Sequence, residues 1–233
     1  MPRFDVEIEL VRWIASMGGQ SWFLDRLTLT LVSSHLFRAM PSVVILAGYW
    51  AAAGSAGRGH AIRRRVFAGF LASGAALVVS RIIQNGFRSL RPINDPAFTG
   101  LFHPSFHPMD LHSFPSDHAA MLVPLVCTIA ALDLSAGAAT GLLLACAMLA
   151  RVWRGLHYPS DILAGALLGF VIVWFVHLRP EPVDWGLDFL DSARRRWPVV
   201  VGMALFLIAF FFASMFESVR ELVVNVGHAL WGG

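Results

Sequence analysis

Apolar runs about as long as a membrane-spanning helix, separated by short polar segments, dominate the chain. A helix needs about 20 mostly apolar residues to cross the ~30 Å hydrocarbon core of a bilayer, and this criterion finds about six such runs. The pattern therefore predicts an all-α fold, a polytopic membrane helical bundle with about six transmembrane helices. The predicted spans are Leu27 to Ala53, Val66 to Gln84, His118 to Leu134, Ala136 to Val152, Pro159 to Leu178 and Trp197 to Phe216.

The amino-terminal part of the chain has a weaker pattern. Two ionisable residues and a proline within the first span predict that its first half is kinked or interfacial; they are His35, Arg38 and Pro41. Residues Phe4 to Met17 fit an amphipathic helix on the membrane surface, although DVEIEL also alternates like a strand. We find no signal-peptide pattern and no linker, so we expect one domain over residues 1–233, with residues 1–26 as an interfacial segment.

Composition supports a membrane protein and excludes several functions. Of the 233 residues, 57% are hydrophobic and 14% are charged, which lies outside the range of soluble globular domains. The 18 basic residues are all arginine and the net charge is only +3. Because no basic stripe is interleaved with aromatic residues, no nucleic-acid partner is expected. The two cysteines lie within apolar runs and offer no disulfide framework.

Arginine clusters predict how the chain crosses the membrane. One cluster, at residues 58–65, follows the first span, and a second, at residues 179–196, follows the fifth. Alternating spans put both clusters on one side, which the positive-inside rule assigns to the cytoplasm. The segments Phe87 to Pro115 and Arg151 to Tyr158, together with both termini, are then expected on the opposite side.

Three polar segments at that opposite face carry the candidate chemistry: QNGFRSLRP (residues 84–92), FPSDHAA (114–120) and ARVWRGLHYPSD (150–161). An arginine at the bilayer centre costs about 2.5–3.5 kcal/mol on insertion scales, so several arginines near span ends indicate a shared task. Singly, each residue has an ordinary explanation: a structural histidine, a headgroup-anchoring arginine, a Pro-Ser-Asp helix cap. Jointly, they favour a phosphate site.

The third segment has the form of an activated histidine. Pro159 suits the first turn of a helix, and Asp161 suits the positive end of the helix dipole. The Asp161 carboxylate can accept a hydrogen bond from one ring nitrogen of His157, which fixes the tautomer and leaves the other nitrogen free to attack.

The second segment has the form of an anion site. Pro115 is expected to open a helix, and the backbone amides at Ser116, Asp117 and His118 are expected to point outward as a cradle for an anion. Arginines from the other two segments add planar donors that match phosphate oxygens. These arginines are Arg91 and Arg151.

Together the three segments resemble the signature of the type 2 phosphatidic acid phosphatase superfamily, which contains membrane lipid phosphatases. The family pattern is Lys, six residues and Arg-Pro, then Pro-Ser-Gly-His, then Ser-Arg, five residues, His, three residues and Asp. The resemblance covers residues 84–161, and the six-span layout is similar to that of bacterial membrane members. The chain keeps Arg91-Pro92, Pro115-Ser116, His118, Arg151, His157 and Asp161 at this spacing.

The chain departs from the family pattern at three positions. Gln84 replaces the lysine, which removes a phosphate-binding cation that Arg88 or Arg81 would have to replace. Asp117 replaces the glycine and would repel an anion unless its side chain turns toward an arginine or away from the pocket. SFPSDH is nevertheless similar to the segment of bacterial undecaprenyl-diphosphatases. Ala150 replaces the serine, a loss of at most about 0.5–1.5 kcal/mol.

The resemblance implies roles for the site residues. His157 attacks phosphorus and becomes phosphohistidine, Asp161 stabilises the charge that develops on its ring, and His118 protonates the leaving oxygen and later takes a proton from water. The resemblance implies no metal and no cofactor. The substrate-binding residues that it implies are Arg91, Arg151, Ser116, Asp117, Gln84 and Arg88.

The resemblance predicts metal-independent hydrolysis of a lipid phosphate, with undecaprenyl diphosphate as the first choice of substrate. Phosphatidic acid and phosphatidylglycerol phosphate are the next choices, and a lipid phosphotransferase would share the first half of the mechanism. The missing lysine also leaves open a catalytically weak protein that binds or transports lipid phosphates. The expected partners are the lipid substrate and the bilayer, and the expected location is the bacterial inner membrane with the site facing the periplasm.

The loop over residues 101–113 is rich in histidine, so a zinc site has to be considered there. His103, His107, Asp110 and His112 have a spacing that fits no strong metal pattern. We therefore favour a lid or a headgroup contact over metal binding, with an irregular solvated loop as the ordinary alternative.

Overall fold

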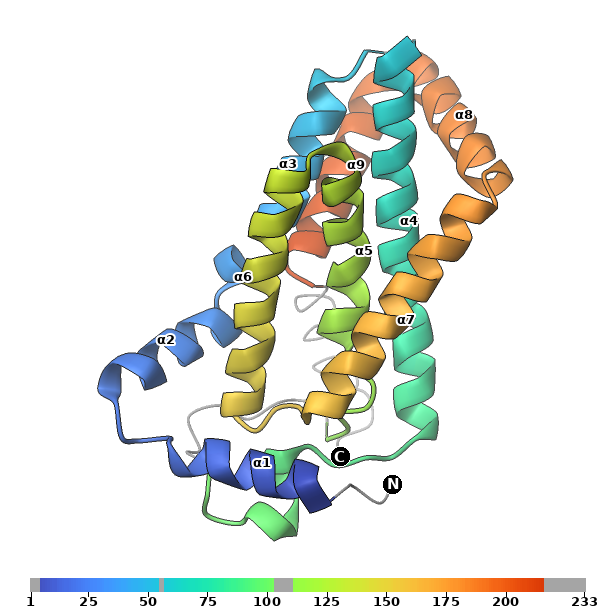
Figure 1. Cartoon of the computed structure of the whole chain (residues 1–233). Coiled ribbons are helices and arrows are strands. Elements are labelled where there is room, and N and C mark those ends of the chain that lie inside the picture. The colour runs from blue at the N-terminus through green and yellow to red at the C-terminus, as the bar shows by residue number, and fades with distance from the viewer. Residues whose placement is uncertain (1–4, 55–56, 103–110, 216–233) are drawn as a thin grey trace, which may run out of the picture.

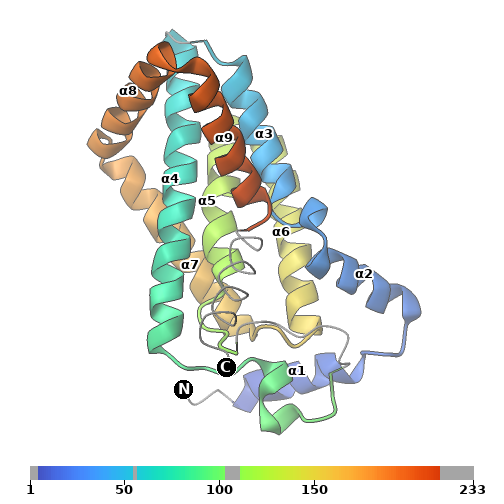
Figure 2. The same cartoon turned by 180° about the vertical axis from the view of Figure 1, so that it is seen from behind.

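The computed structural model describes residues 5–54, 57–102 and 111–215, which form an all-helical bundle as predicted. Four helices run side by side through the bundle, and α3 (Met40–Ala52) and α9 (Pro198–Ala213) pack against one end of it (Figures 1 and 2). The described part contains no strand, only an isolated bridge between Leu90 and His112. The four helices are α4 (Gly57–Gly86), α5 (Asp117–Leu132), α6 (Leu134–Trp153) and α7 (Pro159–Leu178).

Each later predicted span lies mainly within one helix of the described structure, although α4 extends beyond its span and the span from His118 to Leu134 runs past the end of α5. Helices α4, α6 and α7 are long and apolar enough to cross a membrane, by length and composition. Helices α3, α5 and α9 are apolar but shorter. Helix α7 has the predicted bounds because Pro159 stands at its start and the apolar run ends with it.

The prediction of one kinked span from Leu27 to Ala53 is wrong, because the chain breaks into three pieces there. Helix α2 (Trp22–Ser33) is followed by the short 3₁₀ turn η1 (His35–Phe37) before α3 begins. Ser34 has extended dihedrals, and Pro41, which lacks an N–H, stands in the first turn of α3. Helix α2 consequently leaves the axis of the bundle and contacts α6 (Figure 1).

The segment after α7, predicted as a loop, contains the amphipathic helix α8 (Glu181–Arg196). Its first turn is acidic and its last turn holds three arginines, the order that the helix dipole favours. Val183 and Leu187 are buried, and Asp184 pairs with Arg64 of α4. A search for long apolar runs misses such a helix because only one of its faces is apolar.

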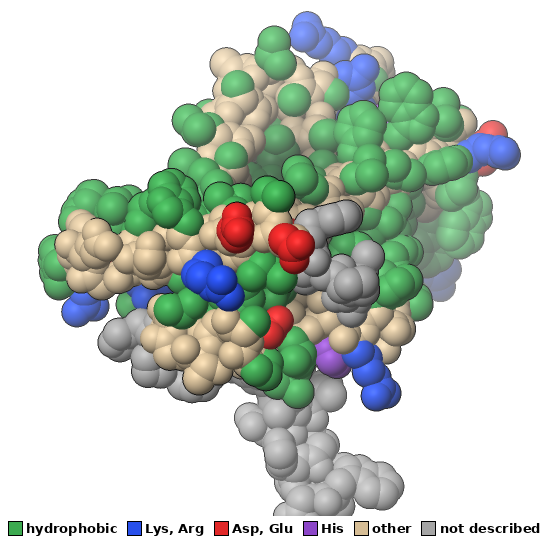
Figure 3. Space-filling model, turned by 60° about the horizontal axis from the view of Figure 1, so that its bottom comes forward, with side chains coloured by type: hydrophobic (Ala, Val, Ile, Leu, Met, Phe, Trp, Pro, Cys, Tyr) green, Lys and Arg blue, Asp and Glu red, His purple; other side chains and the backbone are tan. Residues whose placement is uncertain are grey.

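Helix α1 (Asp5–Ser16) lies across the end of the bundle opposite α8 (Figure 1), so the predicted amino-terminal helix is confirmed over the strand alternative. Val11 packs with Phe98 and Tyr158, and the Glu7 carboxylate accepts a hydrogen bond from the Ser160 amide at 2.8 Å. Figure 3 looks onto this end, where charged side chains lie on the face and hydrophobic side chains cover the flanks. Helix α1 thereby supports the start of α7.

Helix α5 lies at the centre and contacts α3, α4, α6 and α7. Helix α7 can approach α5 closely because two glycines without a Cβ face it. A Cβ on Gly165 would lie 2.3 Å from the Ser116 carbonyl oxygen, and a Cβ on Gly169 would lie 2.4 Å from the Ala120 carbonyl oxygen. This contact joins the starts of the two helices, since the Ser116 amide donates to the Asp161 carbonyl at 2.9 Å.

Candidate active site

The connection between α6 and α7 places His157. Gly155 has φ +68°, a left-handed conformation that glycine adopts most readily. A Cβ there would also lie 2.8 Å from the ring of Phe102. The chain therefore turns sharply after α6 and reaches Pro159 with His157 buried inside the protein.

The hydrogen bonds of His157 define its tautomer. Its Nδ1 lies 3.1 Å from the Ser113 carbonyl oxygen, and its Nε2 lies 3.3 Å from Nη1 of Arg91. A carbonyl can only accept and a guanidinium can only donate, so the proton sits on Nδ1. The lone pair of Nε2 is then the nucleophilic electron pair, and Arg91 lies beside it.

Asp161 was predicted to orient the His157 ring by accepting a hydrogen bond from it, but the structure gives its carboxylate another hydrogen bond. Its Oδ2 accepts the Tyr158 amide at 2.9 Å, an N-terminal cap of α7, and lies 3.7 Å from Nδ1 of His157. The Ser113 carbonyl is the nearer acceptor for that nitrogen. At 3.7 Å the buried carboxylate is beyond hydrogen-bonding distance of that nitrogen, so it acts on the ring mainly through its negative charge.

The pKa of His157 is lowered from its ordinary value by burial, which penalises the charged ring, and then by the nearby positive charge of Arg91. Asp161 and Asp117 act in the opposite direction. The ring is therefore kept neutral, the state in which Nε2 can attack.

Helix α5 starts two residues later than predicted. Ser116 is the N-cap, its hydroxyl accepts the Ala119 amide at 3.4 Å, and the helix begins at Asp117 rather than at Pro115. The Ser116 amide donates to the Asp161 carbonyl, and the His118 amide donates to Asp117 Oδ1 at 2.9 Å. These two amides are already paired within the protein, which corrects the prediction that they stand open to an anion.

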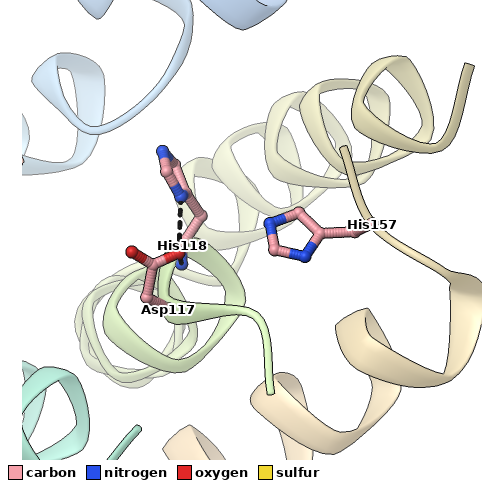
Figure 4. Close-up of side chains that lie close together, drawn as sticks. All are labelled: Asp117, His118 and His157. Carbon is pink, nitrogen blue, oxygen red and sulfur yellow. Dashed lines mark hydrogen bonds and ion pairs between the residues drawn. The ribbon is translucent and has the colours of Figure 1, made fainter. Parts of the chain in front are cut away.

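His118 and His157 come from distant parts of the chain and face one site (Figure 4). Ligand atoms of Asp117, His118 and His157 all lie within 4.8 Å of one another. Within the described residues this is the group with the geometry to hold a metal ion. The same separation suits two imidazoles on either side of one phosphoryl group.

The Asp117 side chain turns toward an arginine, one of the two orientations that the sequence left open. Arg81 donates to Asp117 Oδ2 at 2.6 Å and to Gln84 Oε1 at 3.3 Å. Gln84 is buried and donates to the Pro115 carbonyl at 2.6 Å. Arg88 is exposed, so of the two candidate replacements for the lysine, Arg81 is the one at the site.

The arginines of the third segment separate. Arg151 is buried, donates to the Ala147 carbonyl at 3.2 Å, and its positive charge acts on His118. Arg154 points the other way, toward Thr28 of α2 at 3.2 Å and the Asp25 carbonyl. Only the first of the two belongs to the histidine site.

Two further residues at the site escaped the sequence analysis. One is Ser113, whose carbonyl orients His157; a backbone contact leaves no mark in a motif. The other is Arg38, which is buried and whose charge acts on His118. The next residue, Ala39, packs in one cluster with Met121 and Leu122 of α5. A buried arginine inside an apolar run was the available signal.

A cavity of about 750 Å³ lies between α1, α2 and the end of α6. Trp22, Arg26, Phe102 and Trp153 are among its lining residues, and neither His118 nor His157 is. Of the histidine-rich loop, His103, His107 and Asp110 lie outside the described residues, so its predicted role as a lid stays a prediction.

Comparison with known proteins identifies the family. The model of the PAP2 superfamily matches residues 65–183, just over half of the chain. The bacitracin transport permease protein BcrC of Bacillus licheniformis is 37% identical over 70 residues, which are 30% of this chain and 34% of BcrC, so the match spans about a third of that relative. No solved structure matches the chain. The chain belongs to the PAP2 superfamily, whose members are generally phosphatases, and its apolar helices mark it as a membrane protein.

Proposed function

We propose that the protein hydrolyses a membrane lipid phosphate through a phosphohistidine at His157. The observation that carries this proposal is the pair of facing histidines, whose ligand atoms lie within 4.8 Å. The Nε2 lone pair of His157 is oriented from behind by Ser113, and arginines lie beside both rings.

In the first step, His157 Nε2 attacks phosphorus and the bond from phosphorus to the leaving oxygen breaks. Protonated His118 gives its Nε2 proton to that oxygen. Arg91 and Arg151 stabilise the charge that spreads over the equatorial oxygens. The role of Asp161 is to hold the start of α7 and to stabilise the positive charge that forms on the His157 ring.

In the second step, water replaces the lipid. His118 takes a proton from water, the water oxygen bonds to phosphorus, and the bond from phosphorus to Nε2 breaks. The electron pair returns to His157, and inorganic phosphate leaves.

A lipid diphosphate is the substrate that the charges favour, and undecaprenyl diphosphate is the first choice. Since His118 protonates the leaving oxygen, the leaving group lies on its side of the site. The positive charge of Arg38 acts on His118. The leaving group of a diphosphate is itself a phosphate and carries negative charge, whereas that of phosphatidic acid is a neutral alcohol. A buried arginine near His118 would stabilise the charged phosphate leaving group of a diphosphate more than a neutral alcohol.

Transport or binding of a lipid phosphate is the second candidate function. The name of the relative BcrC describes a bacitracin transport permease, and Gln84 replaces the lysine of the family pattern. The same pocket would then hold a phosphate without turning it over. Phosphatidic acid, phosphatidylglycerol phosphate and transfer to a lipid acceptor remain the alternatives within the enzymatic reading.

Phosphate release by the purified full-length protein in detergent tests the proposal. Undecaprenyl diphosphate, phosphatidic acid and phosphatidylglycerol phosphate are offered separately, with and without EDTA, and we expect release from the diphosphate in both conditions. His157→Ala should abolish release, whereas His177→Ala, at the far end of α7, should leave it unchanged. Rapid acid-free quenching of a labelled substrate should trap phosphate on His157.

Each alternative has its own outcome in this assay. Absence of release from all three lipids, with binding retained, would establish the transport or binding reading. Loss of activity with EDTA would show that the Asp117, His118 and His157 group uses a metal. Appearance of label in an added lipid acceptor would establish transfer.

A further inference from the structure

Two of the three departures from the family pattern, Asp117 and Gln84, are hydrogen-bonded to the same side chain, that of Arg81. Arg81 donates to Asp117, which stands where the family has glycine, at 2.6 Å. It also donates to Gln84, which stands where the family has lysine, at 3.3 Å. Gln84 in turn donates to the Pro115 carbonyl at 2.6 Å. The two replacements are therefore parts of one hydrogen-bonded arrangement at the start of α5.

The other carboxylate oxygen of Asp117, Oδ1, is hydrogen-bonded to His118. Asp117 Oδ1 lies 2.9 Å from Nδ1 of His118 (Figure 4) and accepts the His118 amide at 2.9 Å. A carboxylate can only accept here, so His118 carries its proton on Nδ1. Its Nε2 is buried and has no hydrogen-bond partner among the described residues. The ring is therefore held through Nδ1, and its buried Nε2 stays available for a further hydrogen bond.

We infer that Asp117 is a positioning residue for His118 and that Arg81 anchors it, so that an arginine, an aspartate and a histidine form a relay in this chain. The inference rests on the proposed function and assigns Asp117 a role other than substrate binding. When water attacks the phosphohistidine, its proton moves to His118 Nε2 and the imidazolium is stabilised by the Asp117 carboxylate. The bond to His157 breaks in the same step, and its electron pair returns to that ring.

The charges around His118 explain why such a carboxylate is needed. Arg151 of α6 and Arg38 before α3 both act on the ring with positive charge. His157 faces it across the site. Asp117 is the negative group that opposes the two arginines. Arg81 of α4 contacts the Asp117 carboxylate, and its guanidinium holds that carboxylate in place.

Kinetics of the full-length protein on undecaprenyl diphosphate labelled in its terminal phosphate tests the relay. Asp117→Asn preserves shape and removes charge, and we expect kcat to fall by roughly 10²–10⁴-fold, the typical contribution of general acid–base catalysis. KM should change less than about threefold, whereas both formation and hydrolysis of the phosphoenzyme should slow, because His118 is the acid in the first step and the base in the second. Asp133→Asn, which alters a carboxylate at the start of α6, is the matched control with wild-type kinetics.

Two outcomes would overturn the inference. One is an unchanged kcat in Asp117→Asn, and the other is a rise in KM alone, which would return Asp117 to substrate binding. Arg81→Gln should lower kcat as well, Arg81→Lys should restore part of it, and the double variant with Asp117→Asn should be no slower than the slower single variant. Additive losses would show that the two residues act separately.

A spectroscopic measurement keeps the inference testable without turnover. Nitrogen-15 chemical shifts of labelled histidines, with His118 assigned through His118→Gln, report which ring nitrogen carries the proton. We expect the Nδ1–H form in the wild type and loss of that preference in Asp117→Asn. Failure of the proposed function would leave this result standing, whereas an Nε2–H form in the wild type would refute the relay itself.

Discussion

At the scale of single residues, burial and one nearby arginine decide the state of the nucleophile. His157 is buried, with Arg91 at its Nε2 and a carbonyl at its Nδ1. Both burial and the arginine disfavour a second proton on the ring. In the proposed mechanism the arginine would therefore have two tasks, to keep the ring neutral and to supply positive charge for the phosphate.

The acid limb of the pH profile should report this arrangement. Because the pKa of His157 is lowered from its ordinary value of 6.5, the neutral ring persists as the pH falls below that value. We expect the acid midpoint of kcat/KM to lie below pH 6.5 and to move upward in Arg91→Gln, where the positive charge is absent. Using one substrate for both proteins cancels the ionisation of the substrate itself. An identical midpoint in both proteins would show that Arg91 does not act on the ring.

Arg38 should discriminate between lipid diphosphates and monophosphates. Removing a charge-assisted hydrogen bond costs about 1.5–3 kcal/mol, so Arg38→Gln should lower kcat/KM for the diphosphate roughly 10- to 100-fold. Phosphatidic acid, with its neutral leaving group, should lose much less. The ratio of kcat/KM values for the two lipids is the measurement, and Arg154→Gln, on an arginine directed at α2, is the control. Equal losses on both lipids would assign Arg38 a structural role.

Motif spacing predicted which residues lie at the site, but it predicted less well which hydrogen bonds those residues form. His118, His157, Arg91 and Arg151 were expected together and do come together, because a fixed spacing constrains where helices start. The acceptor for His157 Nδ1 was not predictable, since the Ser113 carbonyl is backbone and any residue type supplies one. The choice between Arg81 and Arg88 needed the helical phase of α4, which sequence spacing alone did not settle.

At the scale of elements, the contact between α5 and α7 brings the two histidines together. Helix α5 carries His118 in its first turn, and His157 precedes the first turn of α7. The backbones touch where Gly165 faces the Ser116 carbonyl, so no side chain separates the two helix starts. The geometry of the site therefore depends on a residue without a side chain.

Replacing Gly165 by alanine should damage activity through this contact. The new Cβ would lie 2.3 Å from the Ser116 carbonyl oxygen, so α7 must shift, and a misplacement of about 1 Å can cost roughly 10²-fold in rate. Gly48→Ala in α3 is the matched control, because nothing lies within 4 Å of its Cβ and alanine stabilises a helix by roughly 0.5–1 kcal/mol. Phosphate release and thermal unfolding are measured for both variants. Wild-type turnover in Gly165→Ala would show that the close contact is dispensable.

The elements were predictable where one local signal dominates. The run beginning at Pro159 combines a helix-starting residue with uninterrupted apolar sequence, and α7 has those bounds. From Leu27 to Ala53 the average hydropathy hides two separate helices, because a window cannot register the break at Ser34 and Pro41. Helix α8 was missed for the reverse reason, since its charges conceal buried Val183 and Leu187 from a search for apolar runs.

At the scale of the whole molecule, the two ends of the bundle use arginine differently. At the end opposite α1, the start of α4 meets α8 (Figures 1 and 2), so both arginine clusters lie together as predicted. At the other end, Arg81 pairs with Asp117, Arg91 bonds to the His157 connection and Arg154 bonds to α2. The arginines at this end are exceptions to the positive-inside rule, and most of them are hydrogen-bonded or ion-paired within the protein.

This asymmetry predicts that the histidine site faces away from the cytoplasm, and cysteine labelling in spheroplasts of a bacterial host tests it. In a background with Cys127→Ala and Cys146→Ala, Asn94→Cys places a thiol on an exposed residue near the site, and Ser192→Cys places one on exposed α8. A membrane-impermeant maleimide should label the first in intact spheroplasts and the second only after permeabilisation, because the clustered arginines of α4 and α8 hold their end in the cytoplasm. The reverse pattern would put the histidines in the cytoplasm and require a substrate presented on the inner leaflet.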